Sequence, residues 1–228
     1  MKNFFYILLF LSFASFSNAY AASDLNVRCK GFAKAPEVSI KAVFEPLKYD
    51  HTKVSRTLSR LHNQEYGESA HRGYQVQGLS TYQLGTELEF SISKRTFNDG
   101  VTCFYPENIT LLIVMKEPTI YIARSLKKGT CAYNIALRHE QTHQQINMEV
   151  IEHFVPLIKE RFLQTVKKYS LASREKDDIT IEQAQKGLKD RYLAAINPLM
   201  DEIKNEIGIE QQKLDRLEQY DYEQNLCQ

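Results

Sequence analysis

The sequence lacks several features that mark common classes of protein. It has no excess of charge of either sign: the formal net charge is +1, so the basic footprint that nucleic-acid binding requires is missing. No CxxC pair occurs, which argues against a cysteine-based zinc site. No apolar run after residue 21 is long enough to cross a bilayer, which takes about 20 residues. Trp is absent, so 13 Tyr and 12 Phe supply the aromatic bulk.

The first residues are predicted to be a secretory signal peptide, residues 1–21. Lys2 gives a positive start, residues 4–16 are almost entirely apolar, and residues 19–21 supply a small-x-small cleavage pattern. With cleavage near Ala21, the mature chain is expected to be periplasmic or secreted, without stable membrane insertion. The alternative is that the segment stays uncleaved as a membrane anchor.

All four cysteines lie beyond this predicted signal peptide, at Cys29, Cys103, Cys131 and Cys227. Export carries them into an oxidising compartment, where two disulfides are the default outcome. Four cysteines allow three connectivities, so the pairing has to be inferred from the arrangement of the chain.

The mature chain, residues 22–228, is expected to form a single α+β domain, because its length suits one globular unit. Its character changes near residue 129. Residues 22–129 carry mainly strand patterns, whereas residues 130–228 carry helical patterns that predict a long antiparallel helical hairpin.

The sheet-rich part contains several separate signals. Strands are expected where apolar and polar side chains alternate, or where a short apolar run predicts a buried strand. Glu117-Pro118 should end one such run, so that a new strand begins after it. By these criteria strands are expected at 38–44, 88–93, 109–115 and 119–125, a helix at 51–62, and a turn at Asn98-Asp99-Gly100.

The helical part shows both start and kink signals. Thr130 is expected to cap the first helix, whose apolar positions recur at helical spacing to about Lys168. Thr180 and the glutamine three residues later have the spacing of a capping box, so the second helix should begin there and run to about Tyr220. Pro198 should kink the second helix, since proline removes a backbone hydrogen bond.

The first of these helices contains an HExxH motif, His139-Glu140-Gln141-Thr142-His143. Side chains four residues apart lie on one face of a helix, so both imidazoles can bind one Zn²⁺ at about 2.0–2.1 Å. Glu140 is offset around the helix and does not ligate. It is expected to be the catalytic base, which takes a proton from the zinc-activated water and passes it to the leaving group.

The surroundings of the motif strengthen the zinc prediction. Both histidines fall within an apolar stripe that predicts a buried helix face. Two polar side chains on one turn of such a face need a shared partner, because burying a polar group unpaired is costly; a metal ion satisfies both. The stripe consists of Ala132, Ile135, Ala136, His139, His143, Ile146, Val150, Phe154 and Leu157.

A catalytic zinc site needs a third protein ligand, and the second helix can supply it. If the helices pack antiparallel from ends near Lys168 and Thr180, the level of the motif corresponds to residues 205–209. A carboxylate in the middle of a packing face is anomalous unless it meets a cation. Glu210 is therefore predicted as the third ligand, with Glu206, at the edge of the face, as the alternative. The apolar stripe there runs through Ile196, Leu199, Ile203, Ile207, Leu214 and Leu217.

The same hairpin favours one disulfide pairing. Cys131 begins the first helix and Cys227 follows the second, so both are expected at the open end of the hairpin. A Cys131–Cys227 bridge would tie that end and hold the site together. Cys29–Cys103 then follows by elimination.

The motif and its setting resemble those of the zincin metallopeptidases. The segment from Tyr121 through residues 131–134 into His139-Glu140 is also similar to uncharacterised exported bacterial families predicted to be zinc-dependent proteases, and the similarity covers residues 100–160. In zincins a sheet precedes the HExxH helix, and its edge strand binds the substrate backbone by strand addition. The resemblance implies that role for Thr119–Ser125, and zinc ligation by the two histidines.

The sequence departs from the standard zincin clans at the third ligand. A metzincin-like pattern would place a glycine and a ligand at positions occupied by Ile146 and Glu149, and a thermolysin-like spacing would place a glutamate at Leu163. Neither pattern fits, so the third ligand depends on the hairpin.

Three functions are compatible with these patterns. The first is an exported zinc-dependent peptidase that acts on a peptide or protein substrate and has no nucleic-acid partner. The second is a non-catalytic envelope protein whose hairpin is an interaction module and whose metal is structural or vestigial. The third is a zinc amidase acting on cell-wall peptide. The HExxH motif favours the first.

Overall fold

The computed structural model describes residues 29, 31, 34–66, 75–169, 171–174 and 179–227. The predicted signal peptide lies outside these residues. A sheet followed by two long helices confirms the α+β class. The elements are β1 (Glu37–Phe44), β2 (Lys48–Asp50), α2 (Ser55–Tyr66), β3 (Gly78–Thr96), β4 (Val101–Ile122), α3 (Cys131–Lys168), β5 (Leu171–Arg174), α4 (Ile181–Leu214) and α5 (Leu217–Asn225).

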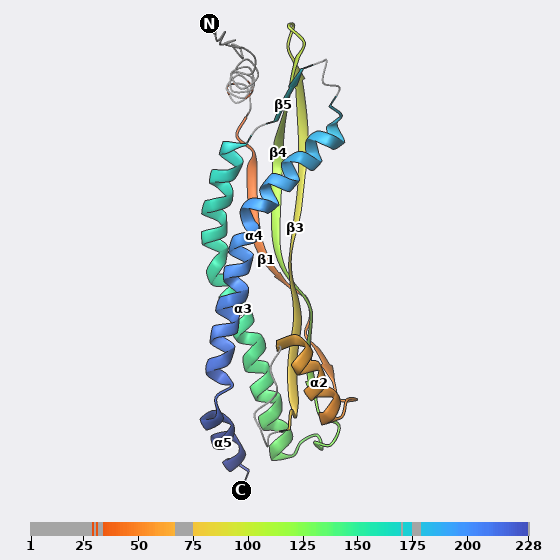
Figure 1. Ribbon diagram of the computed structural model, residues 1–228, viewed down its shortest axis with the longest axis vertical. Helices are drawn as coiled ribbons and strands as arrows, with labels where there is room; N and C mark the ends of the chain where they lie inside the picture. Colours follow the sequence, from red (N-terminus) through yellow and green to blue (C-terminus); the bar gives the residue numbers. More distant parts are fainter. Residues whose placement is uncertain are drawn as a thin grey trace, which may run out of the picture.

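Two very long strands form the spine of the five-stranded sheet. β3 and β4 pair antiparallel along their length and are joined at the predicted turn, where Gly100 has a φ of 79° that favours glycine. On its other side β4 pairs in succession with β5, β1 and β2, the last two in parallel. Figure 1 shows this narrow, twisted sheet running the length of the molecule.

Glu117-Pro118 does not end a strand, contrary to expectation. β4 continues through both residues at an irregularity: Glu117 has a φ of 49°, and the register with β3 shifts between Thr81 and Gln83. The missing N–H of Pro118 falls at this bulge, where the ladder is already interrupted. The predicted strands at 109–115 and 119–125 are therefore parts of one strand.

This continuity also corrects the expected edge strand. Thr119 to Tyr121 pair with β2 on one side and with β3 on the other. The segment therefore lies in the interior of the sheet, and both of its edges carry backbone hydrogen bonds. The strand-addition role that the zincin resemblance implies for Thr119–Ser125 is wrong at this position.

α3 and α4 confirm the predicted helical hairpin and pack on one face of the sheet (Figure 1). Thr130 caps α3 with its side chain, and Thr180 forms the predicted capping box at the start of α4. The second helix ends earlier than expected, at Leu214. Asp215 is its C-cap, and the chain then enters the separate short helix α5.

The main core lies between the sheet and the two long helices. Alternate side chains of β1, β3 and β4 face α3 and α4, as the strand alternation predicts. Each fully buried side chain of this kind contributes about 1.5–3 kcal/mol, so this layer fixes the helix pair on the sheet. Its most buried members include Ile109, Leu111, Ile113 and Met115 of β4, Ile151, Ile158 and Phe162 of α3, and Leu188, Tyr192, Ile196 and Ile203 of α4.

The sheet is covered on both faces where β3 begins and β4 ends. On one face, Leu58 of α2 packs against Leu79. On the opposite face, Tyr133 in the first turn of α3 packs against Ile120 and Ile122. This end of the sheet therefore forms a rigid support for the first turns of α3, which carry the HExxH motif.

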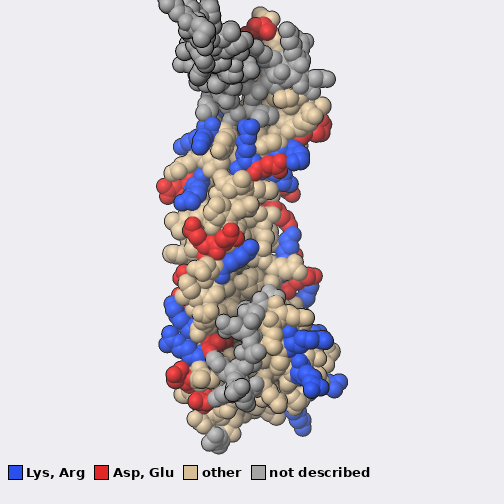
Figure 2. All heavy atoms as spheres, in the orientation of Figure 1, with Lys and Arg blue, Asp and Glu red and all other residues tan. Residues whose placement is uncertain are grey.

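Both predicted disulfides are confirmed: Cys29 is bonded to Cys103, and Cys131 to Cys227. Two disulfides are typical of a protein that folds outside the reducing cytoplasm. None of the described helices has the length and apolar character needed to cross a membrane. Figure 2 shows acidic and basic side chains interspersed along one face, with basic side chains gathered near the end that carries α2.

Candidate metal centre

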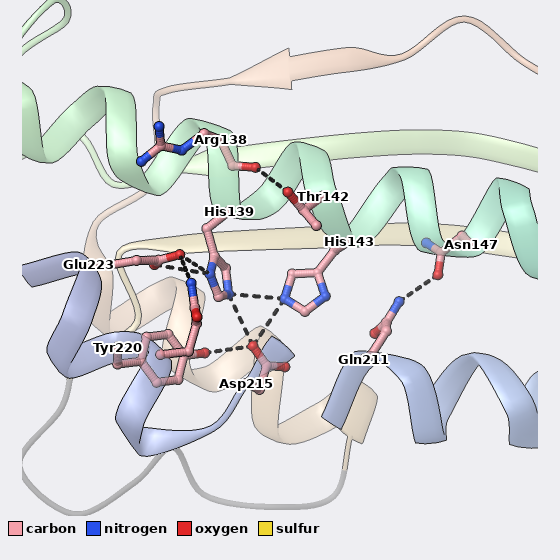
Figure 3. Close-up of polar contacts among 10 residues, drawn as sticks. Arg138, His139, Thr142, His143, Asn147, Gln211, Asp215, Tyr220 and Glu223 are labelled. Carbon is pink, nitrogen blue, oxygen red and sulfur yellow. Dashed lines mark hydrogen bonds and ion pairs between the residues drawn. The ribbon is translucent and has the colours of Figure 1, made fainter. Parts of the chain in front are cut away.

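The two histidines of the motif lie one turn apart on α3 and point to the same place (Figure 3). His139 is 5% exposed and His143 is 6% exposed. Their rings meet edge to face with centroids 4.8 Å apart, and their Nε2 atoms are 3.1 Å apart. Two imidazole nitrogens at this distance can share one proton in a hydrogen bond, or both can direct their lone pairs at one ion. A third group lies beside them.

That group includes the carboxylate of Asp215, at the end of α4. Its Oδ1 atom lies 3.1 Å from Nε2 of His139 and 3.0 Å from Nε2 of His143. Three potential ligand atoms therefore form a nearly equilateral triangle. His139, His143 and Asp215 are the group of described residues whose geometry could hold a metal ion.

The triangle fits a tetrahedral ion. Ligand distances of about 2.0–2.1 Å around such an ion place neighbouring ligand atoms about 3.3–3.4 Å apart. The three observed separations, 3.0 to 3.1 Å, need to open only slightly to reach that spacing. Two imidazoles and one carboxylate are also a donor set that zinc accepts. The site residues therefore suit a metal with three protein ligands and one open position.

The structure places the predicted third ligand, Glu210, elsewhere. Its carboxylate pairs with Lys213 one turn further along α4, and Asp215 takes the position beside the histidines. The alternative, Glu206, is half-buried on the same helix and is not a member of the metal-binding group.

The cause is a displaced helix register. α4 does not start beside the end of α3: its first turns lie on β3, where Gln185 donates a hydrogen bond to the carbonyl of Phe90. Figure 1 shows α4 crossing the sheet obliquely before it comes alongside α3. Because the first turns of α4 lie on β3, a later part of the helix reaches the level of the motif. Gln211 therefore lies opposite Asn147, and Asp215 lies opposite His143.

A buried polar pair fixes this register next to the site. Nε2 of Gln211 donates to Oδ1 of Asn147 at 2.5 Å, and the two side chains are 6% and 0% exposed. A buried amide pair tolerates little sliding, because a shift would leave both groups without partners. This pair therefore sets the position of Asp215 against the histidines.

Helix α5 completes the surroundings of the site. The hydroxyl of Tyr220 donates to Oδ1 of Asp215 at 2.7 Å, and its ring lies 5.2 Å from that of His139. The carboxylate of Glu223 lies 3.2 Å from Nδ1 of His139. The sequence patterns predict neither Asp215 nor Glu223 as a residue of the site. Asp215 lies off the apolar stripe that passes through Leu214 and Leu217, so this pattern gives no signal for it.

Glu140 lies on the side of α3 that faces the sheet. It is 6% exposed and packs on Gly78 at the start of β3. A β-carbon at Gly78 would lie only 2.4 Å from Oε1 of Glu140, so glycine is required for this close approach. Nearby, Gln144 donates to the hydroxyl of Ser80 and to the carbonyl of Thr81, which ties this turn of α3 to β3.

The buried face of α3 is therefore rotated from the predicted apolar stripe. The histidines are buried as expected, but the remaining buried positions beside them are polar. Ala132 and Leu157 of the predicted stripe are exposed, and Ile135, Ala136, Ile146, Val150 and Phe154 are half-buried. The face near the site consists of Tyr133, His139, Glu140, His143, Gln144 and Asn147.

The buried charges shift one another's protonation. Burial raises the pKa of Glu140 to about 7, although both histidines oppose the shift. Burial disfavours protonated His139, yet the hydrogen bond to Asp215 and the charges of Glu140 and Glu223 outweigh it and raise its pKa to about 9. The pKa of Asp215 is held well below its usual range by its contacts with the histidines, against the effect of burial.

Comparison with known proteins adds no family to this geometry. No protein-family model matches the chain, and neither curated proteins nor solved structures give a significant match. The functional interpretation therefore depends on the residues of the site.

Proposed function

We propose that the protein is an exported zinc-dependent hydrolase that acts as a peptidase on a peptide or protein substrate. The observation that carries the proposal is the convergence of His139, His143 and Asp215 on one point, next to the buried carboxylate of Glu140. Three protein ligands with one open position are the arrangement of catalytic zinc sites, whereas structural sites are closed by four.

The chain's own residues have separable roles in this proposal. His139, His143 and Asp215 would hold the ion. When bound, zinc supplies a Lewis acid that lowers the pKa of water to about 7 and polarises a substrate carbonyl. Glu140 would accept the proton at its carboxylate and deliver it to the leaving amine. A carboxylate can make both transfers, because it accepts a proton when ionised and donates it when protonated.

We propose that the substrate binds along β3 rather than along residues 119–125. β3 begins at Gly78, in contact with Glu140. Among the described strands it pairs with β4 alone, so its other edge faces away from the sheet. An extended peptide that adds to this edge would run past the proposed base.

The exported protein can be tested with a library of fluorescence-quenched peptides. Wild type should cleave peptides, and Glu140→Gln should lose activity by about 10²–10⁴-fold, the usual contribution of a general base, while it keeps its zinc. Glu149→Gln, an exposed change on the same helix, should remain active. A protein that holds zinc but cleaves nothing would instead favour a structural metal in an interaction module. Full activity in Glu140→Gln would remove Glu140 from the mechanism.

A further inference from the structure

The C-terminal helix α5 contributes a carboxylate behind one of the two histidines. Glu223 lies 3.2 Å through Oε2 and 3.4 Å through Oε1 from Nδ1 of His139. Nδ1 is on the opposite side of the imidazole from Nε2, which faces Asp215 and His143 (Figure 3). Glu223 can therefore bond to the ring while Nε2 is bound to a metal.

We propose that Glu223 is a positioning residue, which orients His139 for metal binding by accepting a hydrogen bond from its Nδ1–H. This inference rests on the proposed function only in that the site binds a metal. A carboxylate at this place fixes the tautomer whose Nε2 lone pair points at the ion, and it makes the imidazole a stronger donor.

Glu223 is itself held in place. Its side chain is 12% exposed, and Nε2 of Gln219, one turn earlier on α5, donates to its Oε1 at 2.8 Å. The ring of Tyr220 lies against His139 from the same helix. A carboxylate held by a hydrogen bond from Gln219 orients a ring better than a free surface glutamate, because less side-chain freedom remains to be lost.

The two histidines differ in whether a carboxylate lies beside their Nδ1 atom. Nδ1 of His143 is buried and has no hydrogen-bond partner among the described residues. The effect of an outer carboxylate is therefore concentrated at His139. α5 buries none of its own residues, so packing gives little reason for the helix to lie here. Its polar contacts with the site, and the Cys131–Cys227 bridge, supply that reason.

The test compares three variants of the full exported chain. Glu223→Ala removes the acceptor, Glu223→Gln keeps a neutral acceptor of the same size, and Glu218→Gln makes the same charge change at an exposed position of α5. Zinc affinity is measured by competition with a chelator. Co²⁺ is then bound in place of zinc, and its visible absorption spectrum reports the coordination geometry.

Zinc affinity should fall by about 10–100-fold in Glu223→Ala, the usual effect of losing an outer partner of a ligating histidine, and by less in Glu223→Gln. Glu218→Gln should bind as wild type does. The Co²⁺ spectrum should stay four-coordinate in all variants, because no ligand is removed. Wild-type affinity in both Glu223 variants, or a changed coordination number, would overturn the assignment. If wild type itself binds no metal, the proposed function fails instead.

Discussion

Nε2 of His143 lies 3.0 Å from Oδ1 of Asp215, although 72 positions separate the two residues in the chain. The short motif on α3 supplies two potential ligand atoms, and the packing of the hairpin supplies the third. Asp215 reaches the histidines because α4 ends there and the Asn147–Gln211 pair fixes the level at which the helices meet. The site therefore depends on tertiary packing as much as on the HExxH motif.

Replacement of Asp215 distinguishes the candidate ligand that the structure indicates from the one predicted from sequence. Asp215→Asn should weaken zinc binding by more than about 100-fold, since loss of an outer partner alone costs about 10–100-fold. Glu210→Gln is the matched control, because Glu210 pairs with Lys213 at the surface, and it should bind normally. Chelator competition measures both. The reverse ranking would restore Glu210 and reject the observed register.

The sequence predicts those parts of the fold that local interactions decide. Thr130 and Thr180 mark the helix starts because their side chains cap the first turns, and side-chain alternation marks β1 and part of β3. The HExxH motif predicts two ligands because their spacing is fixed within one helix. Asp215 and Glu210 are both acidic residues near one stripe of α4. Only the oblique path of α4 across the sheet decides between them, and no local pattern encodes that path.

Gly78 should matter for activity more than for metal binding. Gly78→Ala places a β-carbon against the carboxylate of Glu140 and should displace it. A displacement of a catalytic group by about 1 Å can cost about 100-fold in hydrolysis. Overpacking at this position should also lower the stability of the fold by about 1–3 kcal/mol. Gly85→Ala is the control on the same strand, because a β-carbon there meets nothing within 4 Å. Equal activity of the two variants would contradict the placement of Glu140.

The two disulfides should have different effects on the site. Cys131 and Cys227 are exposed and tie α5 to the start of α3, whereas Cys29 and Cys103 are each 1% exposed in a separate cluster. Replacing Cys131 and Cys227 by Ser should release α5 and lower zinc affinity by about tenfold or more. Replacing Cys29 and Cys103 by Ser should cost about 2–5 kcal/mol of stability and leave zinc affinity unchanged. Equal zinc affinity in both double variants would show that α5 does not need the bridge.

Protons should compete with zinc at His139. In the metal-free protein its pKa is raised from 6.5 to about 9, and an imidazole must lose its proton to ligate, so zinc affinity should rise with pH up to about 9. The raised pKa stabilises the metal-free fold fully below about pH 6.5, and this contribution is lost as the pH rises through about 9.

The buried carboxyl of Glu140 acts at lower pH: its pKa is raised from 4.5 to about 7, so its ionisation lowers stability between those two values and adds little above about pH 7. Melting temperatures with and without zinc, measured between about pH 6.5 and 9, should therefore diverge as the pH rises. A metal-free melting temperature that increases over this interval would contradict the charge arrangement at His139.

The zinc content of the purified protein tests the central claim most directly. Wild type should hold one zinc ion per chain, removable by chelator and restored by added zinc. The double variant His139→Ala/His143→Ala should hold none while both disulfides remain formed. Wild-type protein that stays free of zinc when zinc is supplied, and is indifferent to chelators, would contradict the account.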